Sequence, residues 1–294
     1  MGTIAIGPTF WALGALACAA AVAYGAYFLA QPPSFVRALV KTTFMGAMAG
    51  ALISAGAPVP LIGAAFFSAL GDLFLAFKAK WTLPFGILAF LLAQLTYVLM
   101  FGAIWFFSGD NAPLWPRYLA MAAIALFLLA FLVWFWRTDE FKRAPMSGAL
   151  SVAALIAVGM LLPLYVIASM MALNGDPESA PAPTAFAPLA GLAFAAIGLA
   201  IWRRKLGAVP LAAMIYAGAI TAMAITAMWL PWIGWLAMLG AVSFLVSDLV
   251  LAAELFRLPA DAAVRRLTAQ VVWWTYMAAQ VLIIAGVINI VRAG

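Results

Sequence analysis

The sequence predicts an all-α, polytopic transmembrane helical bundle of about ten spans. Of its 294 residues, 68% are hydrophobic and 8% are charged, whereas a soluble domain carries roughly 25% charged residues. The apolar stretches continue for about 18 to 25 residues without the alternation typical of a barrel strand. Because backbone amides in lipid must be hydrogen-bonded within the chain, these continuous stretches are expected to be helices.

The expected spans follow one another closely, with proline or glycine at several boundaries. One longer polar stretch, 174–184 (NGDPESAPAPT), is expected to be a loop in water. We treat residues 1–294 as a single transmembrane domain. Its spans are expected near 9–29, 37–56, 60–78, 84–107, 115–136, 147–173, 187–203, 209–229, 232–256 and 269–291.

The basic residues fall on alternate loops of this arrangement. Twelve lie on one side, and only Arg117 and Arg292 lie on the other. Because positively charged loops face the cytoplasm, both termini are expected on the non-cytoplasmic side of a bacterial inner membrane. The net charge of +6 follows from this topology and does not indicate a nucleic-acid partner. The twelve are Arg37, Lys78, Lys80, Arg137, Lys142, Arg143, Arg203, Arg204, Lys205, Arg257, Arg265 and Arg266.

The chain has one cysteine, Cys18, and no histidine. A single cysteine cannot form an intrachain disulfide, and Cys18 is expected to be a small packing residue within a helix. A zinc hydrolase with imidazole ligands is excluded because the chain has no imidazole. We expect neither a metal nor a cofactor.

Three charged residues lie clearly inside the expected spans, away from their ends, namely Lys41, Asp72 and Asp248, whereas Glu254 lies near a span end. A charge at mid-membrane costs at least ~2.5–3.5 kcal/mol, so such residues usually face the bundle interior and have a function. On the assigned orientation they lie roughly 6, 9 and 12 Å from the cytoplasmic ends of their spans. This common depth predicts a polar chamber in the cytoplasmic half of the bundle. Other polar side chains expected near it are Gln94, Tyr97, Tyr216, Tyr276 and Gln280.

The two aspartates lie in similar short motifs. Gly71-Asp72-Leu-Phe-Leu-Ala resembles Ser247-Asp248-Leu-Val-Leu-Ala, and each span is followed by one with a tyrosine and a glutamine. A parallel internal repeat about an axis along the membrane normal would bring the two aspartates face to face. The sequence permits such a repeat.

These motifs resemble those of the YhhN family of membrane proteins, whose characterised members are lysoplasmalogenases. The resemblance covers about 35–107 and 187–290 and implies a core of eight spans, with about 110–175 as a two-helix insertion. Gln94 stands where the family usually has histidine, so an essential imidazole is not implied here. The resemblance depends on Lys41, Ser68-Ala-Leu-Gly71-Asp72-Leu-Phe-Leu75, Gln94-Leu-Thr-Tyr97, Tyr216-xxx-Ile220-xx-Met223, the segment 240–252 that contains Ser247-Asp248, and Tyr276-Met-Ala-Ala-Gln280.

The resemblance implies an ether hydrolase that cleaves the vinyl ether bond of a lysoplasmalogen to a fatty aldehyde and a glycerophospho-base. Vinyl ethers are cleaved by protonation of the alkene carbon, and water then captures the oxocarbenium ion. Two carboxyl groups suit this chemistry, as they do in glycosidases. Asp72 and Asp248 would divide the roles of acid and base, in an order that the sequence leaves open. Lys41 would keep one of them ionised or bind the lipid phosphate. Tyr97, Tyr216 and Tyr276 would position water or the ether oxygen, and Gln94, Ser247 and Gln280 complete the candidate set.

Two other interpretations stay open. The two aspartates could pair with Lys41 and tyrosine hydroxyls only to fix helix packing. A proton-coupled membrane transporter could instead use them as a relay. Headgroup preference, chain length and oligomeric state are not indicated by the sequence. Near the membrane surfaces, Glu254 and Arg257 are expected to form an ion pair, and several tryptophans are expected to be interfacial anchors, namely Trp11, Trp115, Trp229, Trp232 and Trp235.

Overall fold

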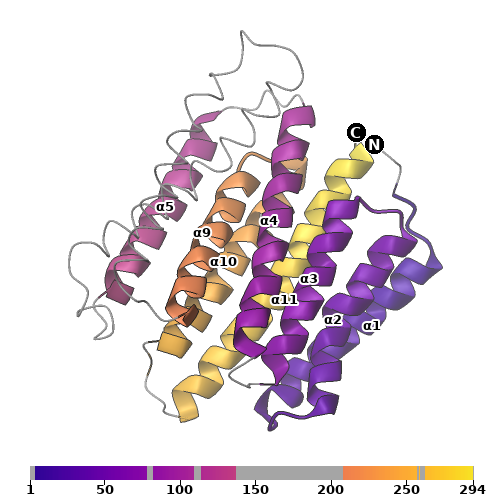
Figure 1. The fold of residues 1–294 in the computed structure, drawn as a ribbon. Coiled ribbons are helices and arrows are strands. Elements are labelled where there is room, and N and C mark those ends of the chain that lie inside the picture. Colours follow the sequence, from indigo (N-terminus) through magenta and orange to yellow (C-terminus); the bar gives the residue numbers. More distant parts are fainter. Residues whose placement is uncertain are drawn as a thin grey trace. The chain divides into compact units, whose positions relative to one another are not determined.

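The computed structural model describes residues 4–77, 82–108, 114–136, 208–256, 258 and 262–293, and within these ranges its regular structure is helical (Figure 1). Six described helices are long and apolar enough to cross a membrane, and two more contain shorter apolar stretches. The predicted polytopic helical bundle is therefore confirmed. The six are α1 (Pro8–Ala26), α2 (Phe35–Ser54), α3 (Val59–Ala76), α4 (Thr82–Ser108), α10 (Trp235–Phe256) and α11 (Ala262–Ala293); the other two are α5 (Leu114–Trp136) and α9 (Ala208–Ala227).

These eight helices correspond to eight of the ten expected spans. The expected spans near 147–173 and 187–203, together with the loop at 174–184, lie outside the described residues. Most of the basic loop residues also lie outside them. The orientation of the chain in the membrane therefore stays a prediction.

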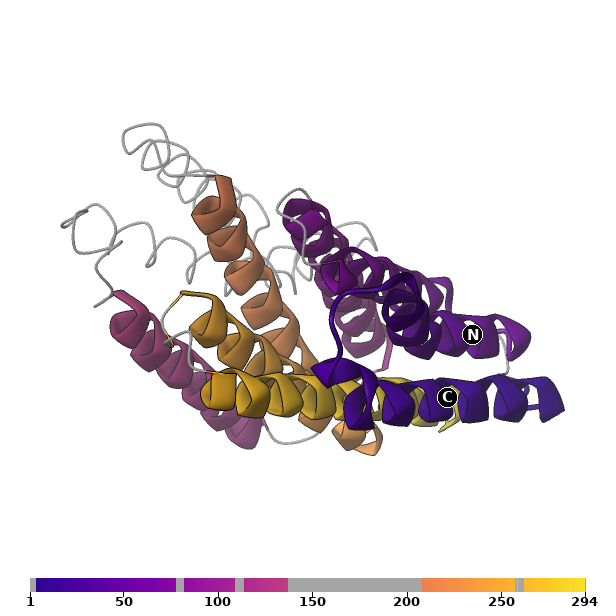
Figure 2. The same cartoon turned by 90° about the horizontal axis from the view of Figure 1, so that it is seen from below.

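The helices form two compact parts, 1–100 with 233–294 and 101–232. The first part contains α1, α2, α3, α10, α11 and most of α4. Within it, α1 packs on α2, α2 packs on α3, and α10 lies against α11 (Figure 2). The N- and C-termini lie at the same end of this part (Figure 1), as an even number of spans requires. In the second part, α5 packs on α9.

Local sequence signals set the ends of α2. At its start, the Ser34 hydroxyl accepts a hydrogen bond of 3.1 Å from the backbone N–H of Arg37, which satisfies one of the free amides of the first turn. At its end, Gly56 has a φ of 67°, a left-handed conformation that costs glycine little. The chain reverses there into α3, so that α2 and α3 become antiparallel neighbours.

Small residues allow α10 and α11 to approach closely. A Cβ at Gly240 would lie 2.8 Å from the backbone oxygen of Ala279, and a Cβ at Gly286 would collide with Ala237. Such contacts are typical of transmembrane helices, which associate through backbone proximity in a solvent as apolar as their own side chains.

Each of the two compact parts contains a buried tryptophan that contacts a neighbouring helix. In the first, Trp273 of α11 donates its ring N–H to the Ala21 carbonyl of α1 at 3.0 Å. In the second, Trp229 is buried, with its ring 5.1 Å from Trp105 and 5.8 Å from Tyr118. The expectation of an interfacial anchor is therefore wrong for Trp229, because its ring fills space between other aromatic rings. The other four expected anchors, Trp11, Trp115, Trp232 and Trp235, are exposed.

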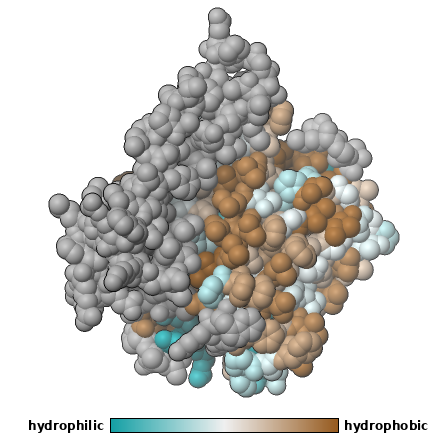
Figure 3. Space-filling model, in the orientation of Figure 1, coloured by the Kyte–Doolittle hydropathy of each residue, from teal (hydrophilic) through white to brown (hydrophobic). Residues whose placement is uncertain are grey.

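The described surface is largely apolar. In the view of Figure 3 it is mostly hydrophobic, and the most hydrophilic residues gather at its lower end. Phe35 and Val59 are among the large apolar residues that are exposed on the surface. Such a surface is favourable in contact with lipid and unfavourable in contact with water. Cys18 lies within helix α1 as expected, but it is exposed, so the expectation that it is a packing residue is wrong.

Candidate active site

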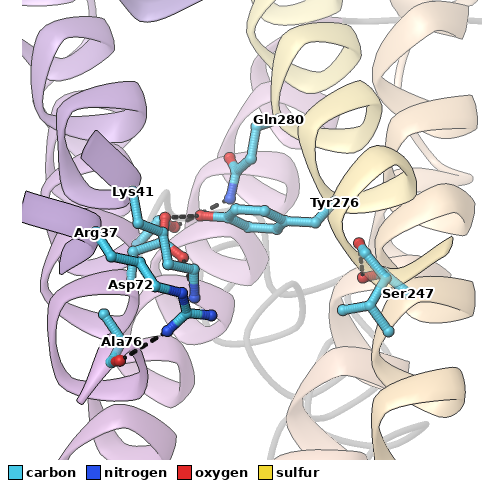
Figure 4. Close-up of polar contacts among 9 residues, drawn as sticks. Arg37, Lys41, Asp72, Ala76, Ser247, Tyr276 and Gln280 are labelled. Atoms are coloured by element: carbon cyan, nitrogen blue, oxygen red, sulfur yellow. Dashed lines mark hydrogen bonds and ion pairs between the residues drawn. The ribbon is translucent and has the colours of Figure 1, made fainter. Parts of the chain in front are cut away.

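Asp72 lies near the C-terminal end of α3 and is 1% exposed. Its Oδ1 is 3.1 Å from the ammonium of Lys41 on α2. Its Oδ2 accepts a hydrogen bond of 2.9 Å from the hydroxyl of Tyr276 on α11 (Figure 4). Both carboxylate oxygens thus have a donor, and the three side chains join three helices.

A second connection lies one helical turn away along α3 and α11. The Gln280 amide N–H₂ donates to the Ser68 hydroxyl at 3.1 Å, and the Tyr97 hydroxyl of α4 donates to the Gln280 amide oxygen at 2.7 Å. All three side chains are fully buried. Ser68 precedes Asp72 by four residues, and Gln280 follows Tyr276 by four. Helices α3 and α11 are therefore joined by two side-chain hydrogen bonds, one helical turn apart.

Arg37 extends the site on the α2 side. It precedes Lys41 by four residues, so the two cations share one face of the helix. Its Nη1 donates to the Ala76 carbonyl and its Nε to the Phe28 carbonyl, each at 3.0 Å. The guanidinium carbon lies 5.3 Å from the ring centre of Tyr24. The expectation that Arg37 belongs to a loop is wrong, because it is a buried part of α2.

Four aromatic rings surround that of Tyr276, and we call them the aromatic collar. Phe44 lies 6.1 Å away, Phe90 5.8 Å, Phe244 5.5 Å and Trp273 5.9 Å, between ring centres. They come from α2, α4, α10 and α11, and their edge-to-face or tilted contacts favour one ring orientation. The collar therefore directs the Tyr276 hydroxyl towards Asp72.

Gly71 gives this collar its space. A Cβ at this position would lie 2.5 Å from the Phe90 ring. Phe90 consequently packs directly on the backbone next to Asp72. The glycine of the Gly71-Asp72 motif is thus explained by a close contact between α3 and α4.

Asp248 lies on α10 and is partly exposed. It follows Phe244 by four residues, so it shares the face of α10 that carries a collar ring. The preceding residue, Ser247, is buried and donates to the Val272 carbonyl of α11 at 2.9 Å. Asp248 is therefore one turn beyond the collar along α10. Its meeting with Asp72 stays a prediction.

The remaining candidates are less directly connected. Gln94 is fully buried on α4, one turn before Tyr97. Tyr216 is half-buried on α9, in the second compact part, so its role beside Asp72 stays a prediction. Glu254 accepts a hydrogen bond of 2.6 Å from the Thr268 hydroxyl, while its expected partner Arg257 lies outside the described residues. In the described ranges, no three His, Cys, Asp or Glu side chains gather closely enough to hold a metal ion.

Fold and site together define a polytopic helical membrane protein with a buried ion pair that tyrosine and glutamine side chains support. A sequence profile of the YhhN family matches residues 36–172 and 149–287, and the chain belongs to this family. The expected membership is confirmed. The matched ranges include residues 110–175, and both the two-helix insertion and the internal repeat stay predictions.

The chain is also similar to proteins named lysoplasmalogenase from Mycobacterium bovis and Mycobacterium tuberculosis. Each is 33% identical over 132 residues, which cover 40% of this chain and 49% of the relative. The chain thus spans about half the length of the curated relatives it matches. No solved structure matches it significantly.

Proposed function

We propose that this protein is an intramembrane lipid hydrolase that cleaves the vinyl ether bond of a lysoplasmalogen. The name of its relatives supports this substrate class. The observation that carries the proposal is the buried carboxylate of Asp72, which accepts from both Lys41 and Tyr276 inside an apolar bundle. An intramembrane charge is costly, and a function accounts for its presence.

The reaction begins with transfer of a proton to the alkene carbon that does not bear oxygen. The resulting oxocarbenium ion is attacked by water at the ether-bearing carbon, and the water loses a proton to a carboxylate. The hemiacetal then collapses. Its bond to the glycerol oxygen breaks, that oxygen takes up a proton, and the hemiacetal hydroxyl loses one. One water molecule is consumed, and a fatty aldehyde and a glycerophospho-base are formed.

The geometry favours one division of roles. Asp72 accepts from donors on both oxygens, an arrangement that suits an ionised carboxylate. Asp72 would therefore stabilise the oxocarbenium ion, take the proton from water and return it to the glycerol oxygen when the hemiacetal collapses. Asp248 would be the acid that protonates the alkene and would regain a proton when the hemiacetal collapses. Tyr276 positions Asp72, and Gln280 with Ser68 fixes α11 against α3.

The same proposal places the site in the cytoplasmic half of the membrane. Asp72 lies one turn before the C-terminal end of α3, and Lys41 lies near the start of α2. Both ends belong to the side that carries the basic loops. A lysophospholipid of the inner leaflet would then present its polar end next to these residues.

The test is aldehyde release by the purified protein from a lysoplasmalogen in detergent micelles, detected by mass spectrometry. In heavy water, one deuterium is expected on the carbon next to the aldehyde, because the solvent-derived proton is added there. The saturated alkyl ether of the same chain is the control and should stay intact. Absence of aldehyde, or equal cleavage of the alkyl ether, would refute the proposed reaction.

A further inference from the structure

The charge of Arg37 is buried without a counter-charge in the described part of the chain. The residue is 4% exposed, and its Nε and Nη1 donate to the uncharged carbonyls of Phe28 and Ala76. Its Nη2 makes no hydrogen bond with a described residue. A buried charge is strongly destabilising unless an opposite charge accompanies it.

The surroundings increase the positive charge. Arg37 and Lys41 lie one turn apart on α2, and Asp72 is the one carboxylate that pairs with either of them among the described residues. Arg37 also lies in the first turn of α2, where the aligned peptide dipoles add partial positive charge. Two cations, one carboxylate and a helix N-terminus leave a net attraction for an anion.

We propose that Arg37 binds the phosphate of the lysophospholipid, and that the charge of Lys41, one turn further along α2, adds to the attraction without contacting the phosphate. The inference rests on the proposed function and deepens it, because it sets the position of the substrate along the helices. Guanidinium groups recognise phosphate through charge-assisted hydrogen bonds, and the Nη2 of Arg37 is the donor left for this purpose.

The spacing of the site matches that of the substrate. Residues four apart on a helix, such as Arg37 and Lys41, differ in height by about 6 Å. In a lysoplasmalogen, about five bonds join the phosphorus to the ether oxygen, roughly 6 Å when extended. A phosphate at Arg37 therefore brings the vinyl ether level with Lys41 and Asp72. The hydrocarbon chain then continues towards the bundle centre.

The test compares two substrates, a lysoplasmalogen and the alkenylglycerol of the same chain, which lacks phosphate. Arg37→Gln should raise KM for the lysoplasmalogen about tenfold to a hundredfold, the effect of one charge-assisted hydrogen bond. KM for the alkenylglycerol should stay unchanged. Arg37→Lys keeps the positive charge but loses the planar guanidinium group, so its KM for the lysoplasmalogen should lie between that of the unaltered protein and that of Arg37→Gln. The matched control is Arg266→Gln, which removes an exposed charge and should alter neither KM.

An equal loss of activity on both substrates would overturn the inference, because Arg37 would then only hold α2 against α3.

Binding to the unaltered protein gives a second test that does not need turnover. A lysophosphatidylethanolamine should raise the melting temperature more than a monoacylglycerol of the same chain. Equal shifts would overturn the phosphate site even if aldehyde is formed. Stabilisation by inorganic phosphate alone, equal to that by the lipid, would overturn the headgroup assignment. If neither substrate yields aldehyde but the phosphate-bearing lipid stabilises the protein, the proposed reaction fails and the anion site stands.

Discussion

The hydroxyl of Tyr276 on α11 donates a hydrogen bond of 2.9 Å to Oδ2 of Asp72 on α3, although 204 positions separate the two residues. The other carboxylate oxygen of Asp72, Oδ1, forms an ion pair with Lys41 of α2. The carboxylate is thus held from two sides by side chains of two different helices. Its position is set by the packing of the bundle, and the aromatic collar limits how far the Tyr276 ring can turn.

Tyr276→Phe tests this arrangement. The phenyl ring keeps the collar contacts, but Asp72 loses one of its two donors. We expect kcat for aldehyde release to fall about tenfold or more, in line with the loss of a hydrogen bond to a charged group. The control is Tyr27→Phe, at an exposed tyrosine of the same part, which should leave kcat unchanged. Equal rates in the two variants would show that Tyr276 has only a packing role.

The two aspartates are tested separately by Asp72→Asn and Asp248→Asn. The amide keeps the shape of the side chain but can neither take up nor release a proton at neutral pH. General acid–base catalysis contributes about 10²–10⁴-fold, so each variant should lose turnover by at least about a hundredfold. Glu254→Gln changes a carboxylate that bonds Thr268 and should keep full turnover. An aspartate whose asparagine variant retains full turnover takes no part in the chemistry.

The ion pair allows a test of function against packing. Lys41→Met leaves Asp72 buried without its counter-charge, and breaking a buried pair from one side costs about 3–5 kcal/mol. Adding Asp72→Asn removes the isolated charge, so the double variant should regain most of the lost melting temperature. It should still release no aldehyde. A stable double variant with normal turnover would mean that the pair only fixes helix packing.

The sequence predicted the charged centre of the site for a physical reason. A charged side chain within a long apolar stretch is conspicuous, and lipid makes it seek a partner inside the bundle. Lys41 and Asp72 were identifiable in this way, and the structure pairs them. The spacing of Tyr276 and Gln280 predicted that they share a helix face, and both indeed contact α3 residues.

Other parts of the site could not be predicted from local pattern. Arg37 stands at the start of a span, where its sequence context is the same as that of a loop arginine. Ser68 within a helix can bond its own backbone, so its contact with Gln280 has no sequence signal. The collar depends on which spans are neighbours, and phenylalanine is too common in this chain, with 21 copies, to mark a contact. The one available signal was the spacing of four residues, which places Arg37 on the helix face of Lys41 and Ser68 on that of Asp72 but does not indicate what either residue contacts.

Gly71→Ala tests whether the collar positions the chemistry. Its Cβ would lie 2.5 Å from the Phe90 ring, so the ring must shift and disturb its contact with Tyr276. We expect a loss of about 1–3 kcal/mol in stability, typical of overpacking, and reduced aldehyde release. Gly46→Ala is the matched control, because a Cβ there meets nothing within 4 Å. In a helix, alanine is favoured over glycine by about 1 kcal/mol, so this control should be neutral or stabilising.

A second variant tests whether the effect of Gly71→Ala comes from crowding against Phe90. Phe90→Leu provides a smaller side chain beside Gly71, and combining it with Gly71→Ala should recover part of the lost melting temperature. Activity should recover less, because leucine does not restore the ring contact with Tyr276. Equal melting temperatures for Gly71→Ala and Gly46→Ala would contradict the close contact between α3 and α4. In that case the other three collar rings, those of Phe44, Phe244 and Trp273, would direct the Tyr276 hydroxyl towards Asp72.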